Sequence, residues 1–188
     1  MLAAVLAGVI GGLSVAGAVR GASVTRVKWG LAMVAAAALA AAGCGGDEGG
    51  EPLSKQEFIA LGDAICTKYR DKNQELSKKA PAKNPTDPSA TDSQVKASAP
   101  VLEQLADNLR SARAEFEELN PPADAQSDWD NTLEDLDQIA SQLDGAAAAA
   151  RQVDRQKVVN LYADILRLNR RVSTFEVDYG FKVCGTSA

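Results

Sequence analysis

Histidine is absent from the 188 residues of this chain. Its absence excludes Ser-His-Asp and Cys-His nucleophile systems, histidine-ligated zinc or haem, and the Glu-x-x-His pairs that carboxylate-bridged di-iron bundles require. The acidic groups of the sequence lie mainly outside its apolar stripes, at positions typical of solvated helix faces. We therefore expect a protein that is not an enzyme and that has no metal site and no cofactor.

Acidic side chains are missing from residues 1–43, which contain three basic residues. The following 145 residues contain 17 Lys and Arg against 25 Asp and Glu, a net charge of −8. An acidic domain repels phosphate backbones and anionic lipid headgroups, so we expect neither nucleic-acid binding nor polybasic attachment to a membrane. Small cationic or mixed-charge partners are compatible with this charge.

A basic start and a short apolar stretch follow one another within residues 24–43. Arg26 and Lys28 precede an uncharged run, residues 29–43, that is rich in Ala, Leu and Val. This order is typical of a secretory signal peptide, and the run is too short to cross a membrane comfortably. It ends in small residues directly before Cys44, which resembles the lipobox of bacterial lipoproteins.

This resemblance implies that Cys44 becomes the lipidated first residue of the mature protein, on the extracytoplasmic face of the cell membrane. The family pattern usually has Leu three positions before the cysteine; here Ala41 stands there and Leu39 lies two places further back. The Gly-rich residues 44–53 are typical of a flexible tether. The mature part also resembles small helical lipoproteins of actinobacteria in outline, a resemblance that implies no activity.

Residues 1–19 form a second uncharged stretch, long enough for a transmembrane helix. An alternative interpretation starts translation at Val24, because bacterial GTG codons can initiate, and makes residues 1–23 an apolar extension before the signal peptide. We favour the start at Val24, since the signal peptide then has an ordinary length. In both interpretations the extension contributes nothing to the folded domain.

Four segments after the tether repeat apolar residues at three- and four-residue spacing, which predicts amphipathic helices. The first helix is expected to begin with a capping box at Ser54 and to run to about Ala80. A proline-rich crossover, residues 79–92, follows it, and Pro100 is expected to separate or kink the first turn of the second helix. The central apolar positions of the four stripes are Phe58, Leu61, Gly62, Cys66 and Tyr69; Leu102, Leu105, Leu109 and Phe116; Trp129, Leu133, Leu136, Ile139 and Leu143; and Leu161, Ile165, Leu168, Val172 and Phe175.

The sequence defines some of the remaining helix ends more clearly than others. The run of alanines after Gly145 leaves the end of the third helix open, because alanine favours the helix. Asp154 is expected to cap the fourth helix, and Gly180 to end it in a left-handed conformation. Helices of about 40 Å each, with short connections before the third and fourth, predict an all-α antiparallel up-down-up-down four-helix bundle over residues 54–188.

Two cysteines accompany Cys44 in the part of the chain that would be exported. Cys66 lies near the start of the first helix and Cys184 near the end of the chain, and an antiparallel bundle places these two regions at one pole. Because exported proteins meet an oxidising environment, we predict a Cys66–Cys184 disulfide. Two reduced buried thiols, or a two-cysteine metal site, are the alternatives.

Two features are candidates for contact with a ligand or partner. Arg167, Arg170 and Arg171 form a cationic strip that could receive an anionic group, with ion pairs inside the bundle as the alternative explanation. Trp129 opens the third stripe and could face a ligand, although an aromatic side chain at such a position usually packs in the core.

The sequence is compatible with two functions. We expect a membrane-anchored extracytoplasmic lipoprotein whose non-catalytic bundle interacts with another envelope protein. The alternative is a lipoprotein that binds or senses a small molecule in a pocket between helices. A pocket lined by Trp129, Tyr69 or Tyr162 would favour the alternative, and a tightly filled seam with an exposed apolar patch would favour a protein partner.

Overall fold

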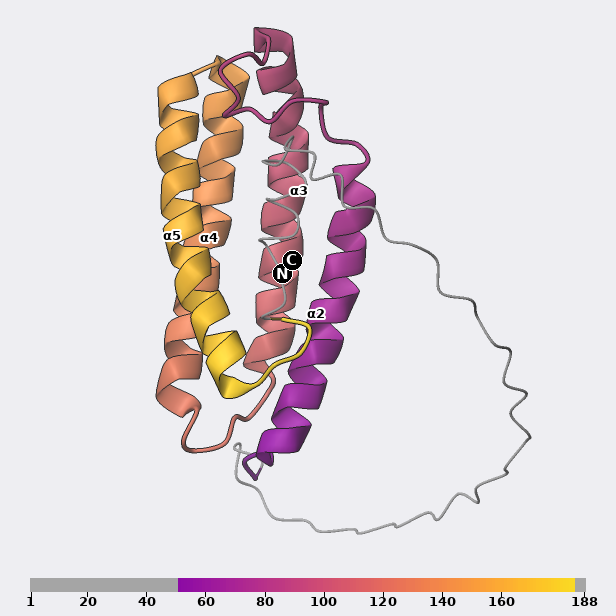
Figure 1. Cartoon of the computed structure of the whole chain (residues 1–188), viewed down its shortest axis with the longest axis vertical. Coiled ribbons are helices and arrows are strands. Elements are labelled where there is room, and N and C mark those ends of the chain that lie inside the picture. The colour runs from indigo at the N-terminus through magenta and orange to yellow at the C-terminus, as the bar shows by residue number, and fades with distance from the viewer. Residues whose placement is uncertain (1–50, 185–188) are drawn as a thin grey trace, which may run out of the picture.

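The structure is a computed structural model that describes residues 51–184, and this part of the chain forms four helices and no strand (Figure 1). Successive helices run in opposite directions, so the predicted antiparallel four-helix bundle is confirmed for these residues. None of the four is long and apolar enough to cross a membrane. Their bounds are α2, Lys55–Ser77; α3, Asp92–Glu117; α4, Gln126–Gln152; and α5, Arg155–Tyr179.

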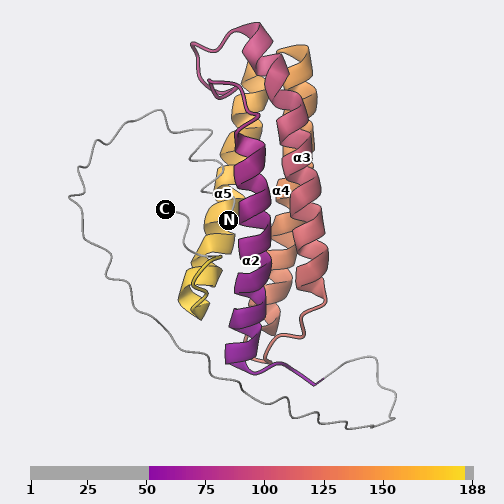
Figure 2. The ribbon, with the colours of Figure 1, turned by 90° about the vertical axis from the view of Figure 1, so that its right-hand side faces the viewer.

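The four helices do not pack equally. α4 packs closely along both α3 and α5, whereas α2 packs less extensively on α3 (Figures 1 and 2). Buried side chains from all four helices nevertheless form one core, in which Phe58, Ile139 and Ile165 are completely covered. The most peripheral helix is therefore α2.

Three predicted helix ends are confirmed. The Ser54 hydroxyl accepts the Glu57 amide at 3.3 Å, and the Glu57 carboxylate accepts the Ser54 amide at 3.1 Å. Asp154 accepts the Lys157 amide at 3.1 Å at the start of α5. Gly180 ends α5 with a φ of 109°, a conformation that glycine adopts without steric penalty.

Two expectations about α2 were wrong. The helix ends at Ser77 rather than near Ala80, because the chain turns at Lys78 ahead of the proline-rich connection. Leu61 is 45% exposed instead of contributing to the core. The buried stripe runs through Phe58, Gly62 and Cys66, and Leu61 lies on the helix beside it.

The second helix begins earlier than its apolar stripe suggests. Thr91 and Gln94 form a capping box, and α3 continues through Pro100 instead of starting near it. The first turns of α3 are tilted against the rest of the helix (Figure 2), as expected where proline removes a backbone hydrogen bond.

The alanine run continues α4 to Gln152. Val153 then closes the helix in the left-handed conformation, with a φ of 58°. Ala146, Ala147 and Ala150 are fully buried. Small side chains thus let this end of α4 approach its neighbours closely.

Candidate functional site: the groove between α4 and α5

An open groove of about 880 Å³ lies between the first half of α4 and the second half of α5. It forms because the two helices cross, so that these halves diverge toward the lower pole in Figure 1. Ten of its twelve lining residues are polar or charged, and two are aromatic. α4 contributes Asp128, Asn131, Thr132, Glu134, Asp135 and Gln138; α5 contributes Arg167, Arg171, Thr174, Phe175, Asp178 and Tyr179.

An ion pair joins the two walls of the groove. The guanidinium of Arg171 donates to both carboxylate oxygens of Asp135, with 2.8 Å from Nε to Oδ2. These hydrogen bonds raise the pKa of Arg171 above its ordinary value. Asp135 is only 7% exposed, whereas Arg171 lies at the surface. The arginine therefore neutralises a carboxylate that would otherwise be buried alone.

The other two arginines of the predicted strip are placed differently. Arg167 lines the groove and pairs with Asp164 on its own helix at 3.3 Å. Arg170 does not line the groove, and its side chain makes no ion pair with residues 51–184. Ion pairing thus accounts for two arginines of the strip, and the groove does not present a continuous cationic surface.

Three exposed carboxylates of the groove form no ion pair within 4 Å among residues 51–184, although Gln138 donates a hydrogen bond to Glu134 and the charge of Glu134 acts on Arg171. The three are Asp128 and Glu134 on α4 and Asp178 on α5. Four acids and two arginines line the groove, which gives it a net negative charge. The unpaired acids are therefore the groups available to an incoming cation.

Two stacked rings belong to the lower end of the groove. Phe175 and Tyr179 lie with ring centroids 5.5 Å apart and planes at 26°. Burial, and next the charge of Asp124, raises the pKa of Tyr179. Its Oη is covered and has no hydrogen-bond partner, although a buried phenol usually finds one.

Trp129 lies in the core and does not line the groove. It is 3% exposed, and its ring contacts Phe58 and Phe116 at centroid distances of 4.9 and 5.4 Å. Tyr162, also considered as a pocket-lining residue, borders only a gap of about 10 Å³. The aromatic residues that do reach the groove are those near the end of α5.

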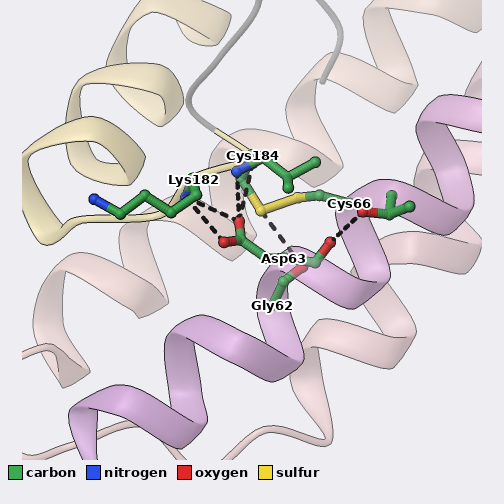
Figure 3. Close-up of a disulfide and its surroundings, with 7 residues drawn as sticks. Gly62, Asp63, Cys66, Lys182 and Cys184 are labelled. Atoms are coloured by element: carbon green, nitrogen blue, oxygen red, sulfur yellow. Dashed lines mark hydrogen bonds between the residues drawn. A yellow bond between two sulfur atoms is a disulfide. The ribbon is translucent and has the colours of Figure 1, made fainter. Parts of the chain in front are cut away.

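The opposite side of α5 is closed by the C-terminal tail. Cys66 and Cys184 form the predicted disulfide, with their Cα atoms 5.3 Å apart. Asp63 accepts the backbone amides of Lys182, Val183 and Cys184 at 2.8–3.2 Å (Figure 3). Covalent and charge-assisted bonds therefore attach the tail to α2 at adjacent positions.

The ring of Phe181 fills the space above Gly62. A Cβ atom at Gly62 would lie 2.4 Å from Cε1 of this ring, so any larger residue at that position of α2 would force the ring to move. Phe181 also stacks on Trp129, at 6.4 Å between centroids and 13° between planes. The tail thus completes the core at the seam between α2 and α5.

A buried carboxylate, Glu176, lies beside the disulfide. It is 7% exposed, its Oε2 has no hydrogen-bond partner, and a carboxylate oxygen lies within 4.8 Å of the sulfurs of Cys66 and Cys184. Burial raises its pKa to about 7, and the charge of Asp63 acts in the same direction. Cysteines joined in a disulfide do not offer the thiolates that bind zinc, so this grouping is not a metal site in the oxidised protein.

Sequence reasoning missed the roles of Asp63 and Glu176. Asp63 looks like an ordinary helix-surface acid until the tail returns to it, and no local pattern marks it. Glu176 carried a signal, since it falls between Val172 and Gly180 on the side of α5 that the stripe predicts to be buried.

No known protein family, curated protein or solved structure matches this sequence. The assignment of a function therefore depends on the residues of the chain itself. The predicted signal peptide, residues 24–43, and the predicted lipidation site, Cys44, lie outside the described residues, as does the extension 1–23.

Proposed function

We propose that this protein is a non-catalytic binding module, anchored through a lipid on Cys44 to the extracytoplasmic face of the cell membrane. Its α4–α5 groove receives a segment of another envelope protein. The observation that carries the proposal is the groove itself, which is polar, open and bordered by exposed charged groups beside an otherwise filled core.

The character of the groove favours a protein partner. Sites for small molecules are concave, bury most of the ligand and are lined mainly by apolar side chains. This groove is open along one side, and only Phe175 and Tyr179 among its lining residues carry large apolar surfaces. Protein interfaces, in contrast, combine a few aromatic anchors with polar and charged surroundings.

The anchor is tested by replacing its cysteine. Cys44→Ala in the native host should release the protein from membranes or leave it unprocessed. Mass spectrometry should find a diacylglycerol group on Cys44 of the wild-type protein. An unmodified, uncleaved N-terminus on the mature wild-type protein would contradict the anchoring proposal.

The interaction is tested with a photo-crosslinking amino acid in the anchored full-length protein. Placed at Asn131 or Thr174, in opposite walls of the groove, it should give one discrete adduct with an envelope protein. The control position is Asp107, an exposed residue of α3 outside the groove. Adducts of equal intensity from all three positions, or none from the groove, would contradict the proposed interaction.

Binding of a small molecule is the second candidate function. The groove volume of about 880 Å³ is within the range of ligand sites, and this observation favours it. A thermal-shift screen with envelope metabolites tests it directly. Stabilisation by several degrees that Arg171→Ala abolishes, without crosslinked protein, would support this function instead.

A further inference from the structure

We infer that the segment bound in the α4–α5 groove is an extended basic peptide whose Lys or Arg side chains lie against the acids of the groove and the rings at its lower end. This inference rests on the proposed function and adds the chemistry of the partner. Charge, ring geometry and position along the bundle each contribute to it.

Charge favours a cationic segment. Asp135 is occupied by Arg171, and Arg167 by Asp164, so the two arginines of the groove already have anionic partners. The exposed carboxylates of Asp128, Glu134 and Asp178 remain. An anionic partner would place its charges beside these three, whereas a basic segment complements them and is drawn toward the groove during encounter.

The arrangement of the acids suits more than one cationic group. Asp128 and Glu134 are separated by about 9 Å along α4, from six residues at 1.5 Å each. Asp178 extends the acidic lining to the opposite wall. An extended peptide spans such a length, since alternate side chains on one face of a strand are roughly 7 Å apart.

The rings at the lower end of the groove favour a cation as well. Lys55 places its Nζ 4.3 Å from the centroid of the Tyr179 ring, so this ring binds an ammonium group, and a cation of the ligand would compete with Lys55 for it. The aliphatic stems of lysine or arginine would pack on Phe175.

The groove lies at the pole of the bundle that the tether reaches first. Lys55, in the first turn of α2, contacts Tyr179 of the groove. The ten residues 44–53 extend at most about 35 Å, so the proposed anchor keeps this pole close to the membrane. A basic segment near the membrane in a neighbouring envelope protein would therefore be within reach.

The inference is tested by fluorescence anisotropy with the detergent-solubilised full-length protein. The probe is a labelled peptide of alternating Gly and Lys, and a Gly–Glu peptide of equal length is its control. At low salt the Gly–Lys peptide should bind and the Gly–Glu peptide should not. Asp128→Asn, Glu134→Gln and Asp178→Asn together should weaken binding roughly tenfold or more, because they remove the complementary charge but keep the shapes of the side chains.

A matched variant separates the groove from the overall charge. Asp71→Asn, Glu75→Gln and Asp107→Asn remove three exposed acids from α2 and α3, each ion-paired with a neighbouring base, and should change the affinity less than threefold. Equal losses in both triple variants would overturn the inference. The single change Glu134→Lys, with thermal melting as a check of folding, should reproduce the loss in the groove.

Two further outcomes bear on the occupant. Spermidine that competes as strongly as the peptide would identify a free polyamine as the ligand and overturn the peptide assignment. Crosslinks from Asn131 that persist in the Asp128, Glu134 and Asp178 variant would overturn the basic-segment inference and leave the proposed function intact. If the wild-type groove gives no crosslinks at all, the proposed function itself is contradicted.

Discussion

The C-terminal half of α5 borders two surroundings that differ in almost every respect. Toward α4, its side chains line an open groove of charged and polar groups. Toward α2, the tail after Gly180 fills the seam with Phe181 and the disulfide, and Asp63 binds the tail amides (Figure 3). The same helix thus has one side closed and one side open at the same pole.

This difference shows that the bundle can fill the space between two of its helices, as it does between α2 and α5. The chain closes the α2–α5 seam with apolar, covalent and hydrogen-bonded contacts, although α2 is its most peripheral helix. On the other side of α5, acids remain unpaired at the surface of a groove. These acids do not stabilise the fold and are available for binding. The contrast with the filled α2–α5 seam therefore supports the proposed role of the groove.

Removing the disulfide should have the largest effect on the free energy of unfolding. The bond lies on the closed side of α5 and does not border the groove. The bond joins residues 118 positions apart, and the chain-entropy model assigns such a loop about 4–5 kcal/mol. Cys66→Ala with Cys184→Ala should lower the free energy of unfolding by up to that amount, as measured by urea denaturation.

Peptide binding by the same variant tests whether the groove depends on the closed side of α5. Binding of the Gly–Lys peptide at a temperature where the variant is folded should remain within twofold of the wild-type value. A large loss of affinity would show that the seam and the groove are coupled. Peptide mapping without reductant that found both thiols free in the wild-type protein would contradict the disulfide itself.

Replacing Glu176 should have the second largest effect on the free energy of unfolding, and the size of this effect depends on pH. Burial raises its pKa from about 4.5 to about 7. Below pH 4.5 the carboxyl is protonated in both states, so it produces no difference. As pH rises toward 7, the unfolded chain releases its proton first, and the folded state loses relative stability until both states are ionised. The shift corresponds to a loss of roughly 3 kcal/mol above pH 7.

Glu176→Gln should remove this loss. The free energy of unfolding should rise by roughly 2–3 kcal/mol at pH 8 and change little at pH 4, measured by urea denaturation at both values. Asp178→Asn, two residues along and on the exposed groove side, is the matched control and should not give this gain. A gain that is equal at both pH values would show that Glu176 titrates as an ordinary surface acid.

The closed side of α5 was largely predictable from the sequence, because its determinants are local. The capping box at Ser54, the glycine at 180 and the apolar stripe of α5 fix where α2 begins and α5 ends, and antiparallel order then brings Cys66 near Cys184. Asp63 was not predictable, since its role depends on amides more than 115 positions away. Likewise, Leu61 was misplaced because a stripe defines a helix face only to within about one position.

The open side was predictable only in part. The sequence singled out Arg167 and Arg171 as surface cations, and both line the groove. It did not indicate the space between the helices, because the angle at which α4 and α5 cross depends on how side chains of both helices interlock. Without that angle, Asp128, Glu134 and Asp178 could not be recognised as neighbours of one another.

Replacing Arg171 should destabilise the protein more than replacing Asp135, its partner in the ion pair across the groove. Arg171→Ala leaves the buried carboxylate of Asp135 without its partner, and the free energy of unfolding should fall by roughly 2 kcal/mol. Asp135→Asn leaves only an exposed arginine and should be milder. Arg167→Ala, which breaks a surface pair, should change stability by less than about 0.5 kcal/mol. Equal losses for Arg171→Ala and Arg167→Ala in urea denaturation would contradict this assignment.

Lys55, where the two sides of α5 meet, should have a smaller effect on stability than Arg171. Its ammonium lies over the ring of Tyr179, which lines the groove and also contacts Phe58 and Phe181 of the closed side. Lys55→Gln should lower the free energy of unfolding by only about 0.5–1 kcal/mol, because the interaction is exposed.

The same change should strengthen binding of the Gly–Lys peptide, since it removes a positive charge and frees the ring face for the ligand. Lys72→Gln removes an equivalent contact with Tyr69, at 4.4 Å and away from the groove, and should leave the affinity unchanged. Weaker binding in the Lys55 variant would mean that Lys55 holds Tyr179 in place for the ligand instead of competing with it.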